Sequence, residues 1–195
     1  MHFVAATSRD DRYLDFLIEC FNHEISGLED VEVWVHTCWG NANMQRVQRS
    51  TSYGEAIEIF LDRVAGDVWT IEMKDREYAD LELFRPYRDR LTKKIALGVV
   101  SHRSLQVETP EEVAEDIRYA LNYIDADKLI LTSDCGFGRG GSNRLVAFYK
   151  ATSIAQGANI VRRELGQPEM RVRAADPATQ IDLPRRRAPD SFETF

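Results

Sequence analysis

Hydrophobic and polar residues follow two periods along the chain, one typical of helices and the other typical of strands. Apolar residues recur at helical spacing in four segments, at about 14–25, 56–64, 80–91 and 113–124. Short runs rich in β-branched and other apolar residues predict strands at 31–35, 68–72, 95–100 and 129–132. A long helix is expected over 142–165, so strands and helices alternate along the chain.

One helix start is marked directly in the sequence. Thr109 and Glu112 have the spacing of a capping box, and Pro110 occupies the first helical position. The helix that follows is therefore expected to begin at residue 110.

The alternation of strands with helices predicts right-handed βαβ units and an α/β fold with a parallel sheet. A closed (βα)8 barrel needs about 250 residues, with about 200 near the lower limit. The chain has 195 residues and four predicted strands, so half of such a barrel, or a small open sheet, is expected. Residues 1–170 are predicted to form this unit, and residues 171–195, which include Arg185, Arg186 and Arg187, a disordered tail.

Composition narrows the classes of partner. The chain is 44% hydrophobic and 29% charged, which is typical of a soluble globular protein. Its formal charge of -7 is spread without an acidic block and argues against binding to nucleic acid or to an acidic membrane surface. No apolar run approaches the roughly 18 residues of a membrane span and no signal-peptide pattern is present, so a cytoplasmic location is expected.

The three cysteines are an odd number, which disfavours a disulfide framework and favours reduced thiols. Cys20 lies within a helical pattern, where a packed thiol is expected. Cys38 and Cys135 each follow a predicted strand, and other polar residues lie at similar places. His36 lies two positions before Cys38, Glu72 ends the second strand, and Asp134 directly precedes Cys135.

The carboxyl ends of parallel strands are where sites are built in α/β folds. Spacing of two along an extended segment directs His36 and Cys38 to the same side. Each of these residues alone is a weak signal. One imidazole, two thiolates and one carboxylate at the same sheet edge together fit a tetrahedral zinc site.

Five segments make the chain resemble a known family. They are residues 35–41, 70–72, 98–104, 107–113 and 134–138. In order and in separation they are similar to the C-terminal catalytic domain of cobalamin-independent methionine synthases, and the resemblance extends from about Val31 to Leu165. It implies that the four strands are the last four of a (βα)8 barrel.

The resemblance also implies a ligand set and an activity. Carried over position by position, the zinc ligands are His36, Cys38, Glu72 and Cys135. The implied reaction is a zinc-dependent methyl transfer, from a donor such as methyltetrahydrofolate to the thiol of homocysteine, which gives methionine. Glu72 is expected to be the labile ligand that a substrate thiol replaces. Asp134 is expected either to orient a ligand or to cap the following turn.

Two departures from the family pattern leave alternatives open. Ser101 stands where many relatives have Asp, and Arg103 where they have Lys or His, so a proton-donating role does not carry over to His102, which is one place out of register. The Trp-Gly-Asn run after Cys38 is shared with short relatives that join epoxides to coenzyme M. Alkyl transfer to another small thiol, or a non-catalytic zinc-binding fragment, are the alternatives.

A half-barrel would leave two parallel edge strands and an apolar face exposed, which folded proteins seldom tolerate. We therefore expect self-association, or a second chain that completes the barrel.

Overall fold

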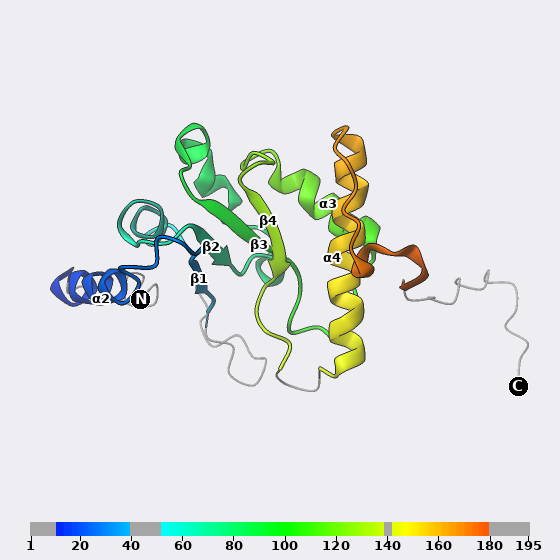
Figure 1. Cartoon of the computed structure of the whole chain (residues 1–195), viewed down its shortest axis with the longest axis horizontal. Helices are drawn as coiled ribbons and strands as arrows, with labels where there is room; N and C mark the ends of the chain where they lie inside the picture. Colours follow the sequence, from blue (N-terminus) through cyan, green and yellow to red (C-terminus); the bar gives the residue numbers. More distant parts are fainter. Residues whose placement is uncertain (1–10, 40–51, 139–141, 180–195) are drawn as a thin grey trace, which may run out of the picture.

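Four parallel strands form a single sheet in the order in which they occur along the chain (Figure 1). The computed structural model describes residues 11–39, 52–138 and 142–179. The strands are β1 (Trp34–Thr37), β2 (Val68–Ile71), β3 (Lys94–Val100) and β4 (Leu129–Ser133). Consecutive parallel neighbours are the arrangement of adjacent strands in a (βα)8 barrel, so the predicted α/β class and parallel sheet are confirmed.

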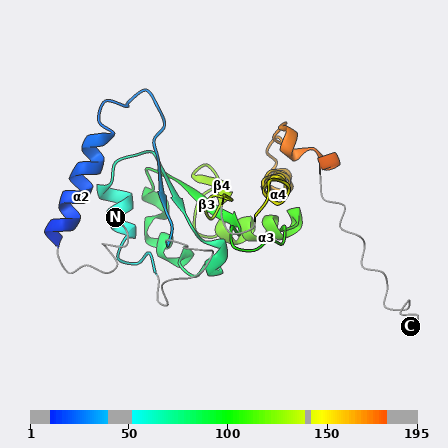
Figure 2. The same ribbon diagram turned by 90° about the horizontal axis from the view of Figure 1, so that it is seen from below.

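Within the described ranges, three α-helices flank this sheet. They are α2 (Asp11–Glu24), α3 (Pro110–Ala120) and α4 (Arg144–Glu164). Figure 2 shows α3 and α4 together at the β4 side of the molecule and α2 at the opposite end, beyond β1. The helices α3 and α4 can approach closely because Gly157 of α4 has no side chain. An added Cβ at this position would lie only 2.6 Å from Cγ1 of Val113.

The predicted start of α3 is confirmed. The Thr109 side chain accepts a hydrogen bond from the Glu112 N–H, and the Glu112 carboxylate accepts one from the Thr109 N–H. At the start of α4, the Asn143 side chain accepts hydrogen bonds from two backbone N–H groups of the first turn. Local capping therefore determines where both helices begin.

Two segments predicted as α-helices have other helical forms. Residues 56–64 contain the π-helix η2 (Ile59–Arg63), in which the N–H of Val64 bonds to the carbonyl of Ile59. Residues 80–91 contain the 3-10 helix η4 (Leu81–Arg90), which has Pro86 inside it. Because proline has no N–H, an unbroken α-helical ladder cannot form there. A short 3-10 turn, η3 (Lys74–Arg76), follows β2.

The hydrophobic core lies on the face of the sheet that the helical segments cover. Alternate residues of β2 and β3 reach it, among them Trp69, Ile71 and Leu97, all at most 1% exposed. Trp69 stacks on Phe60 with ring centroids 5.0 Å apart and tilts against Phe84 at 5.9 Å. This aromatic cluster holds η2 and η4 against the sheet.

The first strand lies later in the chain than its hydrophobic pattern predicts. Residues 31–35 were expected, whereas β1 runs from Trp34 to Thr37 and pairs His36 with Thr70 of β2. The N–H of Val33 donates instead to the Asp67 carboxylate at 2.8 Å, before the strand ladder begins. His36 is therefore part of the strand and does not follow it.

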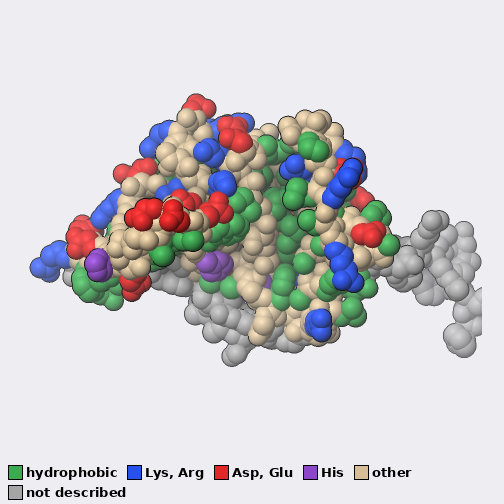
Figure 3. Space-filling model, in the orientation of Figure 1, with side chains coloured by type: hydrophobic (Ala, Val, Ile, Leu, Met, Phe, Trp, Pro, Cys, Tyr) green, Lys and Arg blue, Asp and Glu red, His purple; other side chains and the backbone are tan. Residues whose placement is uncertain are grey.

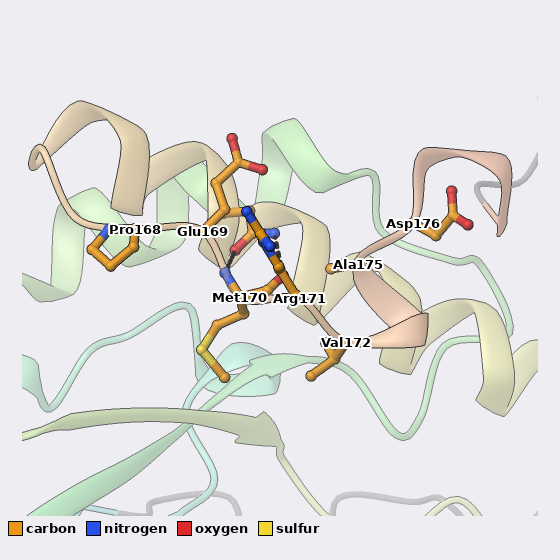
Figure 4. A pocket seen from close by; sticks show the side chains of 8 residues that line it. Pro168, Glu169, Met170, Arg171, Val172, Ala175 and Asp176 are labelled. Carbon is orange, nitrogen blue, oxygen red and sulfur yellow. Dashed lines mark hydrogen bonds between the residues drawn. The ribbon is translucent and has the colours of Figure 1, made fainter.

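The chain after α4 folds back along that helix. The Asn159 side chain accepts from the Met170 N–H at 2.7 Å and donates to the Met170 carbonyl at 3.1 Å. The turns η5 (Arg173–Ala175) and η6 (Pro177–Thr179) follow. Figure 4 shows this segment around a pocket of about 480 Å³, with the side chains of Met170 and Val172 directed toward the sheet.

The first residues of the segment predicted as a tail contact α4. Residues 171–179 pack on α4 because side chains of that helix satisfy backbone groups of the segment, as when Gln156 donates to the carbonyl of Asp176. Residues 180–195, with Arg185, Arg186 and Arg187, lie outside the described residues. No helix within the described ranges is both long and apolar enough to span a bilayer.

Candidate metal centre

Three of the four predicted ligands meet at one end of the sheet. The ligand atoms of His36, Cys38 and Cys135 all lie within 4.8 Å of one another, and the two sulfur atoms are 3.9 Å apart. Cys38 follows β1 and Cys135 follows β4, which are the two edges of the sheet. Strands spaced about 4.8 Å apart would separate these edges by about 14 Å in a flat sheet. The segments after the edge strands must therefore converge, as they do at the mouth of a barrel.

The donor set suits zinc. Two thiolates that share one tetrahedral zinc at about 2.3 Å lie about 3.8 Å apart, and the observed separation is 3.9 Å. Thiolate and imidazole ligands favour zinc over magnesium or calcium, which prefer oxygen. His36 is exposed and both thiols are half-buried, so a substrate could reach the cluster. Three protein ligands with one open position are typical of catalytic zinc.

Glu72 lies near this cluster but is not part of it. Its side chain is fully buried, and its Oε1 receives a hydrogen bond from Nη2 of Arg103 at 2.8 Å. Its Oε2 accepts from the backbone N–H of Trp39 at 3.1 Å. Glu72 is absent from the group of ligand atoms that lie within 4.8 Å of one another. In the structure the carboxylate of Glu72, the predicted labile ligand, is thus hydrogen-bonded to Arg103 and to the Trp39 N–H.

Asp134 caps a turn, although not the turn that follows it. Its Oδ1 accepts from the N–H groups of Met73 at 2.7 Å and Lys74 at 2.9 Å, and its Oδ2 accepts from Asp75 at 2.6 Å. These donors begin the turn after β2. Burial raises the pKa of Asp134, and the nearby Asp75 carboxylate raises it further, while the three N–H donors oppose the shift.

Gly98 makes room for this cap. A Cβ at position 98 would lie 1.9 Å from Oδ1 of Asp134 and 2.8 Å from its Cα. Because Gly98 has no side chain, the carboxylate of Asp134 can cross β3 at this position and reach from β4 to the end of β2.

Sequence reasoning missed Asp75, which the structure brings together with His102 and Asp134 in a second polar group. Asp75, His102 and Asp134 have ligand atoms within 4.8 Å of one another, and Nδ1 of His102 lies 3.2 Å from Oδ2 of Asp75. Burial acts to raise the pKa of Asp75, but the adjacent His102 side chain, the hydrogen bond from Ser101 and the charge of Arg103 outweigh it and lower the pKa. No motif marks Asp75, because its partners are distant in the sequence.

Comparisons with known proteins agree with the resemblance of the motifs. A family model described as "Cobalamin-independent synthase, Catalytic domain" matches residues 3–156. The methionine synthase of Sulfurisphaera tokodaii is 30% identical over 152 residues, covering 78% of this chain and 39% of that protein. The methionine synthase of Thermococcus kodakarensis is 28% identical over 151 residues, covering 77% and 39%.

A solved structure is also similar. It is a B12-independent methionine synthase from Shewanella sp. W3-18-1 in complex with selenomethionine, with a TM-score of 0.65 and 31% sequence identity. The match covers 80% of this chain and 45% of that chain. The present chain thus spans less than half the length of the proteins it matches.

The cap at Asp134 generates a stability prediction. Asp134→Ala removes the acceptor of three backbone N–H groups, and we expect it to lower the free energy of unfolding by about 2–4 kcal/mol. Urea denaturation of the metal-free protein measures the change. Asp89→Ala, at an exposed position, is the control and should stay within about 0.5 kcal/mol of wild type. An equally small effect of Asp134→Ala would contradict the cap.

Proposed function

The chain belongs to the cobalamin-independent methionine synthase family, in its catalytic domain, and on this premise we propose that it is a zinc-dependent methyltransferase acting on the thiol of homocysteine. The convergence of His36, Cys38 and Cys135 carries this proposal. Two thiols and an imidazole at the mouth of a barrel wall are the ligands required to hold zinc beside a thiol substrate. Because the chain spans 39% of the relatives' length, the substrates and activity are proposals for this chain.

The proposed roles of the ligands are unequal. His36, Cys38 and Cys135 would hold the metal, and Glu72 would be the fourth, labile ligand; Arg103 and the Trp39 N–H donate hydrogen bonds to its carboxylate. The chemistry supplied by a bound zinc is stabilisation of a thiolate at neutral pH. The thiolate sulfur of homocysteine then attacks the methyl carbon of a donor such as methyltetrahydrofolate. The new S–C bond forms as the C–N bond breaks, and the donor nitrogen keeps the electron pair and takes up a proton.

Asp134 acts indirectly in this proposal. It keeps the turn at 73–75 in place beside Glu72 through its hydrogen bonds to that turn. Its position next to Cys135 also holds that thiol at the site. We therefore propose a positioning role for Asp134 and not contact with the substrate.

Metal content is the first test. We expect about one zinc per chain after reconstitution under reducing conditions, because three ligands already converge. Elemental analysis after gel filtration measures the ratio. Cys135→Ser should lose the metal, whereas Cys20→Ser, a thiol of α2 that takes no part in the cluster, should keep it. Lack of zinc in the wild-type chain, or full retention in Cys135→Ser, would contradict the centre.

Binding of the acceptor thiol is the second test. With Co²⁺ in place of zinc, homocysteine should strengthen the sulfur-to-cobalt charge-transfer absorption, because its thiolate joins the metal, whereas homoserine should not. Absorption spectra recorded during titration measure this. A response to coenzyme M but not to homocysteine would favour alkyl transfer to another small thiol. No response to any thiol would contradict the proposed transferase activity and would favour a non-catalytic zinc-binding fragment.

We also propose that a second copy of the chain covers the β4 side. A cleft of about 740 Å³ lies between β4, α3 and α4, and its lining includes Leu129, Leu131, Leu165 and Met170. Figure 3 shows hydrophobic side chains gathered along the inner side of α4. Within the described residues no strand pairs with the outer edge of β4 or of β1. Two copies pairing these edges would supply eight strands, the number that closes a barrel.

Self-association can be tested with exposed residues of the cleft. Leu165 and Met170 are each 49% exposed, so Leu165→Glu with Met170→Glu should leave the fold intact but introduce charge into the proposed interface. We expect the wild-type chain to be dimeric by light scattering at micromolar concentration and this variant to shift toward monomer. Leu105→Glu, at a position 53% exposed between β3 and α3 and so on neither edge strand, is the control. A monomeric wild-type chain would contradict the second copy.

A further inference from the structure

Lys150 of α4 is buried although its side chain carries a charge. The side chain is 1% exposed, and the proposed reaction makes no use of it. Its Nζ donates to the carboxylate of Glu108 at 2.6 Å and to the backbone carbonyl of Gln106 at 2.6 Å. A lysine is seldom buried unless it is paired, because removing its charge from water is costly. These two acceptors therefore compensate for the loss of water around the ammonium group.

The contacts of Lys150 close a loop between β3 and α3. The other carboxylate oxygen of Glu108 accepts from the backbone N–H of Ser101 at 2.8 Å, and Ser101 directly follows β3. Glu108 thus joins the two ends of residues 102–107, and Lys150 joins Glu108 and Gln106 to α4. Opening this loop would separate a buried ion pair, which is strongly unfavourable. The loop is therefore held closed from α4.

The same loop carries a side chain to the neighbourhood of the candidate metal centre. Arg103 donates from Nη2 to Oε1 of Glu72 at 2.8 Å. The backbone N–H groups of Arg103 and Ser104 donate to Oγ of Ser101 at 3.0 and 2.9 Å, respectively. The position of Arg103 beside Glu72 therefore depends on the conformation of the loop that Lys150 holds.

We propose that Lys150 is a positioning residue, which holds residues 102–107 closed and so keeps Arg103 hydrogen-bonded to Glu72. This inference rests on the proposed function, in which Glu72 is the fourth zinc ligand. Hydrogen-bond partners of a ligating carboxylate orient it, and their loss weakens metal affinity by about 10- to 100-fold. Lys150 thus influences the ligand set from α4, through the loop.

Two variants test this inference without requiring turnover. Lys150→Met removes the link from α4 to the loop but leaves the Glu108 carboxylate buried without its cation. Lys150→Met combined with Glu108→Gln removes the same link and the charge together, because the amide oxygen of glutamine can still accept from the Ser101 N–H. Replacing both members of a buried ion pair costs much less stability than removing one of them. The double variant therefore separates loss of positioning from loss of stability.

Tryptic cleavage after Arg103 reports on the loop and requires no metal. The wild-type chain should be cut slowly there, because the Arg103 side chain is only 14% exposed. Both variants should be cut on the order of tenfold faster, because the open form of the loop becomes more populated, and mass spectrometry of the fragments measures the rate. Competition with a chelating dye should give a Kd for Zn²⁺ on the order of tenfold weaker in both variants than in wild type.

Arg118→Met is the matched control. Arg118 pairs with Glu164 at 2.6 Å and also joins α4 to another segment, the helix α3, but this pair is largely exposed. Exposed ion pairs contribute little. We therefore expect this variant to keep both the rate of cleavage after Arg103 and the Kd for Zn²⁺ within about twofold of wild type.

The outcomes distinguish this inference from the proposed function. Cleavage after Arg103 that stays as slow as in wild type would overturn the inference. Faster cleavage with an unchanged Kd for Zn²⁺ would also overturn it and would leave the proposed function intact. A wild-type Kd in the double variant alone would show that Lys150 serves stability and not positioning. Zinc binding that does not depend on Cys135 in the wild-type chain would instead overturn the proposed metal centre, and the inference with it.

Discussion

The carboxylate of Asp134 binds three consecutive backbone N–H groups at the end of β2, and the rest of the site depends on this contact. It joins the end of β4 to the end of β2 across β3, at the point where Gly98 leaves space. Cys135 follows Asp134 directly, and Glu72 immediately precedes the capped turn. One buried interaction thus sets the distance between the thiol on one strand and the carboxylate on another.

Charged side chains at the ends of β2 and β3 contact one another. Arg103 lies between Glu72 and Asp75, and His102 lies beside Asp75. The pKa shifts follow from this arrangement, since Asp75 is stabilised as a carboxylate by its donors, whereas Asp134, more deeply buried and close to Asp75, has its pKa raised. The hydrogen bonds from Arg103 and from the Trp39 N–H thus limit the positions that the Glu72 carboxylate can adopt.

The centre is built from the two edges of the sheet. His36 lies in β1 and Cys135 follows β4, whereas the central strands β2 and β3 provide the buried support. Whatever pairs with the outer edges of β1 and β4 must therefore influence the geometry of the ligands. The pairing of the edge strands and the arrangement of the candidate ligands are thus physically linked, because the same short segments serve both.

The sequence by itself determined the α/β alternation, the start of α3 at the Thr109 capping box, and the family motifs that include His36, Cys38 and Cys135. These features depend on periodicity and on neighbours a few residues apart. Tertiary structure decided the partner of Glu72, 31 positions away at Arg103, and the cap that Asp134 forms on Met73, 61 positions away. It also decided that residues 171–179 pack along α4. Such contacts join groups that are distant along the chain, and neither member of a pair carries a local signal of the other before the sheet has formed.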